Sequence, residues 1–320
     1  EYPERKFDVN QLNVFNFDIE TVSDDGFPNI REANKEVLSI AIRQGDKSIV
    51  MATPHTNGDK YTPEEGVDFI ECRNEIDLLY KFIDVWVALD PDIVTGWNVE
   101  MFDIPYICNR IKNLYDAKEI NRLSPWNNVS DRQVYKMGRK QQVYDILGVS
   151  HLDYYDLYRK FTYTNRESYR LDHIAHVELG ESKDGNPYET FREWYLKDFQ
   201  SFIDYNIQDV EIVDRLEDKM RLIELCLTMA YDAKVNYMDV LGSVKYWDIL
   251  IYNELRKKNI VIPQKIQRNK DEKFEGAYVK DPQVGLHKWV MSFDLNSLYP
   301  HLIMQYNISP ETLVANEKVK

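Results

Sequence analysis

Two acidic residues lie two positions apart in an apolar stretch near the start of the sequence. The segment Asn13–Thr21 is rich in residues that favour β-structure, and it predicts a strand. Alternate side chains of a strand point to the same face, so we expect the carboxylates of Asp18 and Glu20 to lie side by side. Adjacent carboxylates repel, and each raises the cost of ionising the other. The pair predicts a bound divalent cation, and the alternative for this motif alone is an edge strand with a solvated polar face.

Two other apolar segments carry acids that could complete a site. Asp103 lies at the entrance of a predicted helix, and Tyr205 lies one helical turn before Asp209. Four carboxylates in one pocket would be strongly destabilising unless cations neutralised them. Two Mg²⁺ or Mn²⁺ ions about 3.5–4 Å apart would do so, and they would also support hydrolysis of a phosphodiester. Tyr205 could orient the attacking water, although a tyrosine with a pKa of about 10 is not a strong base.

The first half of the chain predicts an α/β fold, with a mixed β-sheet flanked by helices. The predicted elements are strands at 13–21, 37–43, 48–52 and 93–98 and helices at 74–89 and 104–114. The polar residues 54–68 contain Pro, Gly and Asn and predict a surface loop. Phe27 lies in a turn close to the acidic strand, where it could fold back onto the core or stack on a nucleic-acid base.

The second half of the chain is predicted to be mainly helical after one β-hairpin. The predicted elements are a hairpin at 130–150, helices at 197–230 and 239–258, a linker at 261–275 and a strand at 289–299. The hairpin is basic on both sides of Gly138, and its alternative interpretation is a solvated excursion.

Composition limits the class of protein. The chain has 320 residues, of which 43% are hydrophobic and 13% aromatic, so it is long enough for a sizeable core and more than one domain. A net charge of −14 argues against a generic nucleic-acid coat, but it allows an enzyme that meets nucleic acid in one groove. The three cysteines are far apart, and no apolar run approaches the length of a membrane span. We therefore expect a soluble intracellular protein with no membrane partner.

The acidic segments together resemble a known family. The segments Phe17–Glu20, Thr95–Pro105 and Tyr205–Asp209 are similar to the Exo I, Exo II and Exo III motifs of the 3′→5′ proofreading exonuclease of family B DNA polymerases. Within this family the chain most resembles the replicative polymerases of T-even-like bacteriophages, and Leu152–Tyr158 shares in the resemblance, which covers nearly the whole chain.

The resemblance implies an RNase H-like exonuclease fold of the DEDDy type. It identifies four residues as ligands of two Mg²⁺ or Mn²⁺ ions, and it identifies Tyr205 as the tyrosine of that type. The four implied ligands are Asp18, Glu20, Asp103 and Asp209. It further implies that Phe27, Asn98 and Phe102 contact DNA, and that the basic hairpin resembles the family's strand-separating hairpin.

The C-terminal segment resembles part of a polymerase palm. Ser292–Pro300 is similar to polymerase motif A, although His301 stands where the family has a serine. Asp294 would bind polymerase metal ions, and Leu298 and Tyr299 would contact the incoming nucleotide. Gly276, within Phe274–Tyr278, resembles a segment that contacts the template.

Motifs B and C of the polymerase are absent from the sequence, so this chain alone should not polymerise DNA. We expect either a fragment or the exonuclease half of a split polymerase, completed by a second chain or a missing region. The implied domains are an exonuclease at 1–222, a helical segment at 223–262 and the start of a palm at 263–320.

The sequence therefore predicts a 3′→5′ exodeoxyribonuclease that releases nucleotides from single-stranded or frayed primer-template DNA. A sliding clamp would be a further partner, and the location would be the cytoplasm, that of the bacterial host if a phage encodes the chain. Two alternatives stay open: a non-catalytic assembly subunit of a split polymerase, and a DEDD nuclease that acts on RNA.

Overall fold

The computed structural model describes residues 8–24, 26–53, 60–136, 138–181, 185–262 and 276–312. The chain forms two compact units, Glu1–Pro263 and Gln264–Lys320. The predicted helical segment 223–262 falls within the first unit by this division. Most of the predicted linker, residues 263–275, lies outside the described residues.

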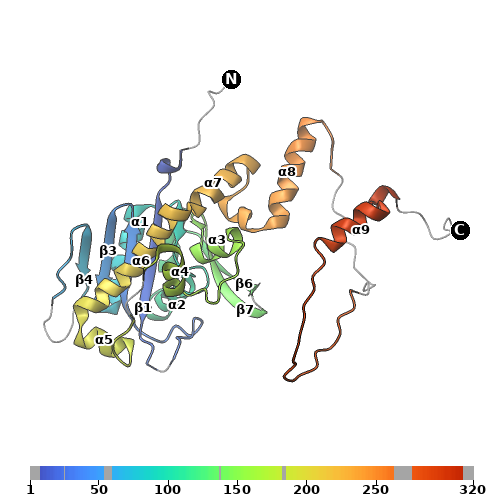
Figure 1. The fold of residues 1–320 in the computed structure, drawn as a ribbon. Helices are drawn as coiled ribbons and strands as arrows, with labels where there is room; N and C mark the ends of the chain where they lie inside the picture. The colour runs from blue at the N-terminus through green and yellow to red at the C-terminus, as the bar shows by residue number, and fades with distance from the viewer. Residues whose placement is uncertain are drawn as a thin grey trace. The chain divides into compact units, whose positions relative to one another are not determined.

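A six-stranded mixed sheet forms the centre of the first unit (Figure 1). In spatial order the strands are β4 (Val67–Glu71), β3 (Lys47–Ala52), β2 (Val37–Gln44), β1 (Val14–Thr21), β5 (Ile93–Thr95) and β8 (Ser150–His151). The central strand β1 pairs antiparallel with β2 and parallel with β5. The predicted mixed sheet is therefore confirmed, and the acidic strand lies in its middle instead of at an edge.

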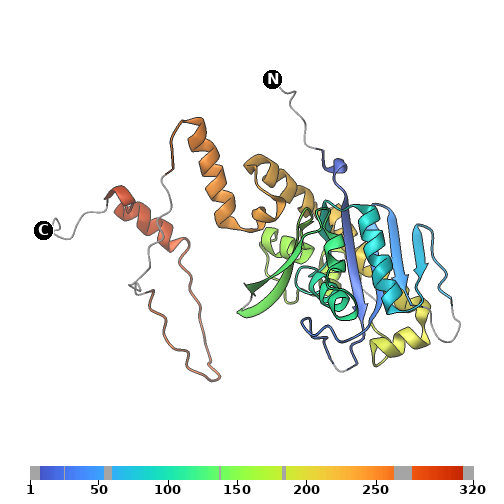
Figure 2. The same ribbon diagram turned by 180° about the vertical axis from the view of Figure 1, so that it is seen from behind.

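The two faces of β1 pack against different helices. Phe15 and Phe17 contact the ring of Trp86 on α1 (Glu75–Leu89), at centroid distances of 4.8 and 6.0 Å. The opposite face meets α6 (Phe199–Met220), where the side-chain amide of Asn16 donates to the Val210 carbonyl at 2.6 Å. Figures 1 and 2 show α6 on one side of the sheet and α1 on the other. The pleat of β1 therefore directs Asp18 and Glu20 toward α6.

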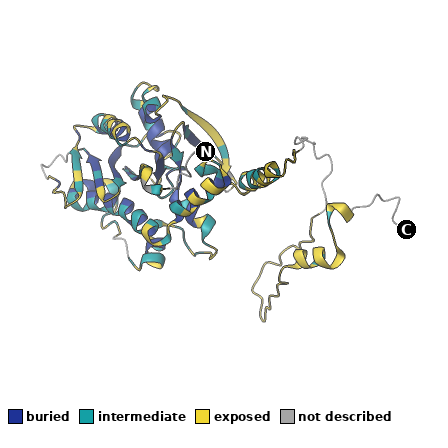
Figure 3. Ribbon diagram, turned by 90° about the horizontal axis from the view of Figure 1, so that it is seen from above, coloured by how far each residue is buried: buried dark blue, intermediate teal, exposed yellow. Residues whose placement is uncertain are grey.

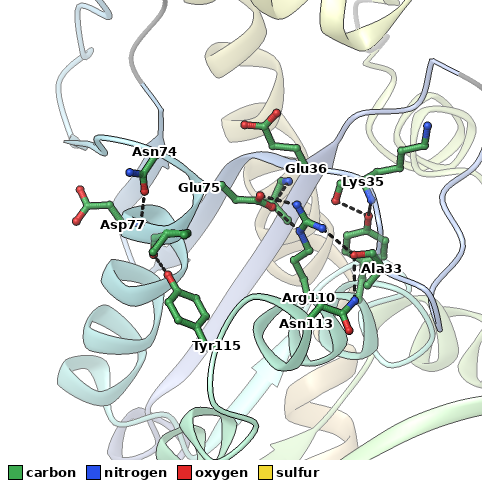
Figure 4. Close-up of polar contacts among 12 residues, drawn as sticks. Ala33, Lys35, Glu36, Asn74, Glu75, Asp77, Arg110, Asn113 and Tyr115 are labelled. Carbon is green, nitrogen blue, oxygen red and sulfur yellow. Dashed lines mark hydrogen bonds and ion pairs between the residues drawn. The ribbon is translucent and has the colours of Figure 1, made fainter.

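A partly buried ion pair fixes α2 (Asp103–Leu114) against α1 (Figure 4). The Arg110 guanidinium donates to both carboxylate oxygens of Glu75, at 2.7 and 2.6 Å, and to the Ala33 carbonyl at 3.0 Å. Glu75 also accepts the backbone N–H of Val37 at 2.8 Å. Because each of the two charges has several partners, the pair holds α2 and the start of β2 in place. Asp103 is the first residue of α2 and is positioned by this anchor.

The first unit contains further helices and one separate hairpin. They are β6 (Val129–Lys136), β7 (Arg139–Ile146), α3 (Tyr154–Phe161), α4 (Leu171–Leu179), α5 (Phe191–Lys197), α7 (Leu222–Ala233), α8 (Ser243–Lys257) and the 3-10 helices Val9–Gln11, Glu119–Leu123 and Tyr237–Leu241. The predicted basic hairpin is confirmed as β6–β7. Its base is not a free projection, because Tyr144 and Ile146 are buried in the core.

Three sequence predictions of element boundaries in the first unit were wrong. The predicted loop 54–68 ends too late, because β4 begins at Val67 and pairs in parallel with β3; residues 54–59 lie outside the described ones. The predicted helix 197–230 is interrupted at Arg221, whose left-handed backbone (φ 52°) ends α6 and begins α7. The predicted helix 239–258 begins as a 3-10 turn, and α8 starts only at Ser243.

The second unit is almost entirely exposed in its described part. Residues 276–312 contain α9 (Leu298–Tyr306) and the 3-10 turn Pro310–Thr312, and they include no strand, so the predicted strand 289–299 was wrong. Figure 3 shows almost all of these residues as exposed, among them apolar side chains that a folded core would bury. The most exposed large apolar residues are Tyr278, Val284, Leu286, Trp289 and Phe293. A strand needs a paired neighbour, and none is present among the described residues of this unit.

Gly96 occupies a position that excludes any side chain. Its φ is +151°, and a Cβ there would lie 2.3 Å from Val99 Cγ1 and 2.6 Å from the carbonyl oxygen of Phe17. Phe17 directly precedes Asp18, so a displacement here would move the acidic strand. This close approach explains why glycine ends the short strand β5.

We expect Gly96→Ala to lower the free energy of unfolding by roughly 3 kcal/mol or more, because the backbone strain and the clash add. Urea denaturation followed by circular dichroism measures the change. Gly180→Ala is the matched control, since Gly180 has a φ of +75° but open space around its Cβ position. The control should cost only about 1 kcal/mol. Equal losses for the two variants would show that the contact with β1 does not matter.

Candidate functional site

Three carboxylates meet on the α6 side of β1. Asp18 and Glu20 come from β1 and Asp209 from α6, and one carboxylate oxygen from each lies within 4.8 Å of the others. Asp209 is buried, and the two strand acids are partly buried. The helix brings Asp209 to the strand because its other inward residues, such as Val210 and Val213, are packed in the core. The structure therefore brings together three of the four predicted acids.

The fourth acid, Asp103, lies beside β1, but its carboxylate is turned toward the backbone of that strand. Its carboxylate accepts the N–H of Ile19 at 3.1 Å, and its side chain is only 2% exposed. Strand β5 ends at Thr95, which pairs with Asn16, so β5 does not reach the backbone of Ile19. Burial raises the pKa of Asp103 to about 8; the nearby carboxylates of Asp153 and Asp209 add to this rise, and the Ile19 N–H opposes it.

A buried amide that the sequence analysis missed positions Asp18. Asn206 donates from its side-chain nitrogen to Asp18 Oδ2 at 2.8 Å, and its side-chain oxygen accepts the hydroxyl of Ser39 at 2.9 Å. Both Asn206 and Ser39 are fully buried. Since Ser39 donates to the amide oxygen, the amide nitrogen must face the carboxylate. An amide on the inward face of a predicted helix was the available signal, because a buried amide needs hydrogen-bond partners.

Tyr205 shares α6 with Asp209, but its ring packs against α5. The ring centroid lies 4.8 Å from that of Trp194 and 5.9 Å from that of Phe191. Tyr205 lines a cavity of about 360 Å³ with Trp194 and Asp204, whereas the strand acids line a different cavity. The structure therefore does not bring the predicted tyrosine into the cavity that contains Asp18 and Glu20.

The strand acids lie in an open cavity of about 410 Å³ with aromatic walls. Its lining residues are Asp18, Ile19, Glu20, Phe27, Trp97, Asn98, Phe102, Asp103, Tyr155, Tyr169, Arg170 and Leu171. On one side Phe27, which is 77% exposed, contacts the ring of Phe102 at a centroid distance of 4.8 Å. On another side the ring of Tyr155 lies between Trp97 and Tyr169, at 5.8 and 6.2 Å. The three residues predicted to contact DNA, Phe27, Asn98 and Phe102, thus line one cavity with the acids.

Two further acids near the cavity have structural partners. Asp153 caps α3 and accepts the backbone N–H groups of Asn98, Glu100 and Tyr155, at 2.9 to 3.0 Å. It thereby fixes the segment between β5 and α2. Burial raises the pKa of Asp153 to about 7, and Asp156 adds to the rise. Asp156 accepts from Lys136 of the hairpin at 2.5 Å.

The predicted palm residues belong to the second unit. Asp294 lies in an irregular segment, and Leu298 begins α9. Tyr299 is 66% exposed, and Gly276 is exposed at the start of the described part of the unit. Phe274 and Glu275, which complete the predicted template segment, lie outside the described residues.

The donor set fits hard divalent cations. All of the converging groups are carboxylates, which Mg²⁺ and Mn²⁺ prefer over nitrogen or sulfur ligands. Asp18, Glu20 and Asp209 would hold a first ion, and Asp103 lies near enough to Asp209 for that carboxylate to raise its pKa. Carboxylates held this close together repel one another when ionised, and this repulsion favours the binding of a cation between them.

We expect the stability of the metal-free chain to fall as pH rises from about 4 to 8. Asp103 ionises near 3.8 in an unfolded chain but near 8 in the folded chain, so over this range the folded chain holds a proton that the unfolded chain has lost. In EDTA, Asp103→Asn should therefore be more stable than the unmodified chain at pH 8, by roughly 2 kcal/mol, and its stability should depend less on pH.

Urea denaturation at pH 5 and pH 8 measures this difference. Asp68→Asn, a change at an exposed aspartate on β4, is the matched control and should leave the pH dependence unaltered. The expectation fails if Asp103→Asn and Asp68→Asn have the same pH profile.

We also expect Asn206→Ala to weaken Mn²⁺ binding by roughly tenfold or more, because Asp18 loses the donor that orients it. Ser39→Ala should have a smaller effect in the same direction, since it frees the Asn206 amide to rotate. Isothermal titration calorimetry of the chain with Mn²⁺ measures the affinity. Asn109→Ala is the matched control: Asn109 is also a buried amide, but it bonds Tyr144 and the Ile30 carbonyl. An unchanged affinity in a folded Asn206→Ala chain would exclude the positioning role.

Comparison with known proteins gives the family. A family model described as DNA polymerase family B, exonuclease domain, matches residues 2–174, and one described as DNA polymerase family B matches residues 243–320. The chain is 38% identical to the DNA-directed DNA polymerase of Escherichia phage RB69, over 99% of the chain and 37% of that relative. It is 36% identical to that of Enterobacteria phage T4, over 98% of the chain and 37% of the relative. It is 28% identical to the DNA polymerase of Paramecium bursaria Chlorella virus NY2A, over 97% of the chain and 36% of that relative. The chain thus spans well under half the length of these relatives.

Proposed function

The chain belongs to DNA polymerase family B, as its motifs predicted, and we propose that its first unit is a proofreading nuclease. It would release mononucleotides from the 3′ end of single-stranded or frayed DNA. The observation that carries the proposal is the convergence of Asp18, Glu20 and Asp209 within 4.8 Å, beside an open cavity with aromatic walls. Such a cluster is typical of sites that hydrolyse phosphodiesters.

The acids would hold two Mg²⁺ or Mn²⁺ ions, which when bound make water nucleophilic and stabilise the leaving oxygen. Asp18 is oriented by Asn206, so one of its oxygens is fixed by a hydrogen bond. Asp209 is held by a helix that packs along β1 and β2. Since both elements are anchored in the core, the reacting phosphodiester meets acids that need little reorganisation.

Tyr205 would position the attacking water in this proposal. Its ring lies against Trp194, so this role requires the ring to turn away from α5 and toward Asp209. A tyrosine needs only rotation about its side-chain bonds for such a change. Its hydroxyl would donate or accept a hydrogen bond and would stay neutral.

The aromatic walls would hold the end of the strand. Phe27 is exposed at the rim, and Tyr155 and Tyr169 offer ring faces on another side of the cavity. Each base has a π-face, so stacking on such rings does not depend on sequence. A paired terminus must first be unstacked, and a mismatched terminus costs less to unstack. This difference would select frayed ends.

The second unit would be part of a polymerase palm. Its exposed apolar residues, including Trp289 and Phe293, need a covering surface, and the relatives are much longer than this chain. We propose that a further region or a second chain covers them and supplies polymerase motifs B and C. Asp294, Leu298 and Tyr299 would then contribute to nucleotide binding, and Gly276 to template contact. The domains would be 1–222, 223–262 and 263–320.

A sliding clamp and primer-template DNA would be the other partners, in the cytoplasm of a bacterial host. Within the described residues no helix is both long and apolar enough to span a membrane.

The proposal predicts that the chain alone shortens a 5′-labelled single-stranded DNA from its 3′ end in Mg²⁺ and not in EDTA. Asp18→Ala combined with Glu20→Ala should lower the rate by at least roughly a thousandfold, because both ions lose ligands. Gel electrophoresis of timed samples measures the ladder of products. Asp68→Asn serves as the control acid outside the cavity.

The outcomes separate the alternatives. A folded chain that binds Mn²⁺ but leaves DNA intact would contradict the proposal and favour an assembly subunit. Faster degradation of an RNA strand of the same sequence would favour a nuclease that acts on RNA.

A further inference from the structure

We propose that Arg170 binds a phosphate of the DNA strand near its 3′ end, at a linkage next to the one that is cleaved. The inference rests on the proposed function, because it assigns one more substrate contact to the same cavity. None of the three motifs includes this arginine, which lies between α3 and α4.

The charge in the cavity is the first observation. Three of the lining residues are acids, and Arg170 is the one lysine or arginine among the described residues that line it. Arg170 is exposed, and it immediately precedes α4. A lone guanidinium on the wall of an acidic cavity offers an anion the one positively charged contact there.

The backbone that carries Arg170 is anchored. The indole N–H of Trp97 donates to the Tyr169 carbonyl at 3.1 Å, and the Arg170 N–H donates to the Ser168 hydroxyl at 3.3 Å. The Arg170 carbonyl accepts the N–H of Ile174 at 3.0 Å. The side chain therefore extends from a fixed point beside the aromatic wall.

The neighbouring basic side chains already have partners. Arg159 lies over the rings of Tyr155 and Tyr169, at 5.5 and 5.0 Å, and donates to the Tyr155 hydroxyl at 3.1 Å. Arg166 donates to Glu178 at 2.7 Å, and Lys136 pairs with Asp156. In contrast, the Arg170 guanidinium forms no hydrogen bond or ion pair with any residue within the described ranges.

Electrostatics then indicates which phosphate Arg170 would bind. Metal ions held by the acids would neutralise the linkage that is cleaved, but they leave the adjacent linkages charged. In a chain of net charge −14, those phosphates would otherwise approach a repulsive surface. An arginine can bind a phosphate through two parallel N–H groups. The contact would therefore orient the phosphate as well as neutralise part of its charge.

Binding of single-stranded DNA tests the inference without hydrolysis. Fluorescence anisotropy with a 5′-labelled 12-nucleotide DNA in Ca²⁺ compares the unmodified chain, Arg170→Ala and Arg170→Lys. We expect Arg170→Ala to bind roughly tenfold more weakly, and the slope of log K against log salt to fall by about 0.7, as for one lost phosphate contact. Arg170→Lys should keep the slope and recover part of the affinity. Arg256→Ala, at an exposed arginine on α8, is the control for the change in net charge.

A neutral methylphosphonate at a single linkage identifies the phosphate. The linkages are counted from the 3′ end of the DNA, and the cleaved linkage is left out. In the unmodified chain, a methylphosphonate at one of the first three of these linkages should weaken binding about as much as Arg170→Ala does. In Arg170→Ala the same substitution should have no further effect. Equal penalties at every position in the two chains, or equal binding by Arg170→Ala and Arg256→Ala, would overturn the inference.

Digestion in Mg²⁺ separates this result from the proposed function. If the unmodified chain degrades DNA and Arg170→Ala raises KM without lowering kcat, both stand. If the chain degrades DNA but Arg170→Ala binds like the control, only the arginine inference fails. If DNA is bound through Arg170 but never degraded, only the proposed nuclease activity fails.

Discussion

Carboxylates held close together repel each other, and the first unit is built so that its acids cannot move apart. Asp18 and Glu20 are fixed by the pleat of a central strand, and Asp209 lies on a helix tied to that strand by the bond from Asn16 to the Val210 carbonyl. The amide of Asn206 holds Asp18 in one orientation. Moving the carboxylates apart would reduce their repulsion but would break core packing. A bound cation reduces the same repulsion at a lower cost in free energy.

The acids around the cavity divide into two kinds according to their partners. Asp153 is buried but accepts three backbone N–H groups, so its charge serves to order the segment that follows β5. The acids of β1 and α6 converge on one another instead. Asp103 combines both situations, because it accepts the Ile19 N–H and has a raised pKa. Convergence on other carboxylates, more than burial, therefore distinguishes the acids that could bind a cation from the acid that orders the backbone.

Local spacing in the sequence was enough to predict what depends on neighbours along the chain. It predicted the acid pair on β1, the helix α1 and the β6–β7 hairpin, because the pleat of a strand, the period of a helix and the turn of a hairpin are local properties. Contacts between distant residues escaped it: Asn206 meets Asp18 across 188 positions, and the ring of Tyr205 finds Trp194. The break at Arg221 was missed because the apolar pattern continues on both sides of a single left-handed residue.

The order of the elements along the chain has a consequence for synthesis. Strand β1 is made early, whereas α6 follows all six strands of the sheet. Until α6 docks, the polar face of β1 is open to water, which screens the charges of Asp18 and Glu20. Docking of α6 adds Asp209, so the three acids come together only after all six strands have been made. Cations that bind the gathered acids bind only the docked form, so their concentration in the cell would affect how firmly α6 stays docked on the sheet.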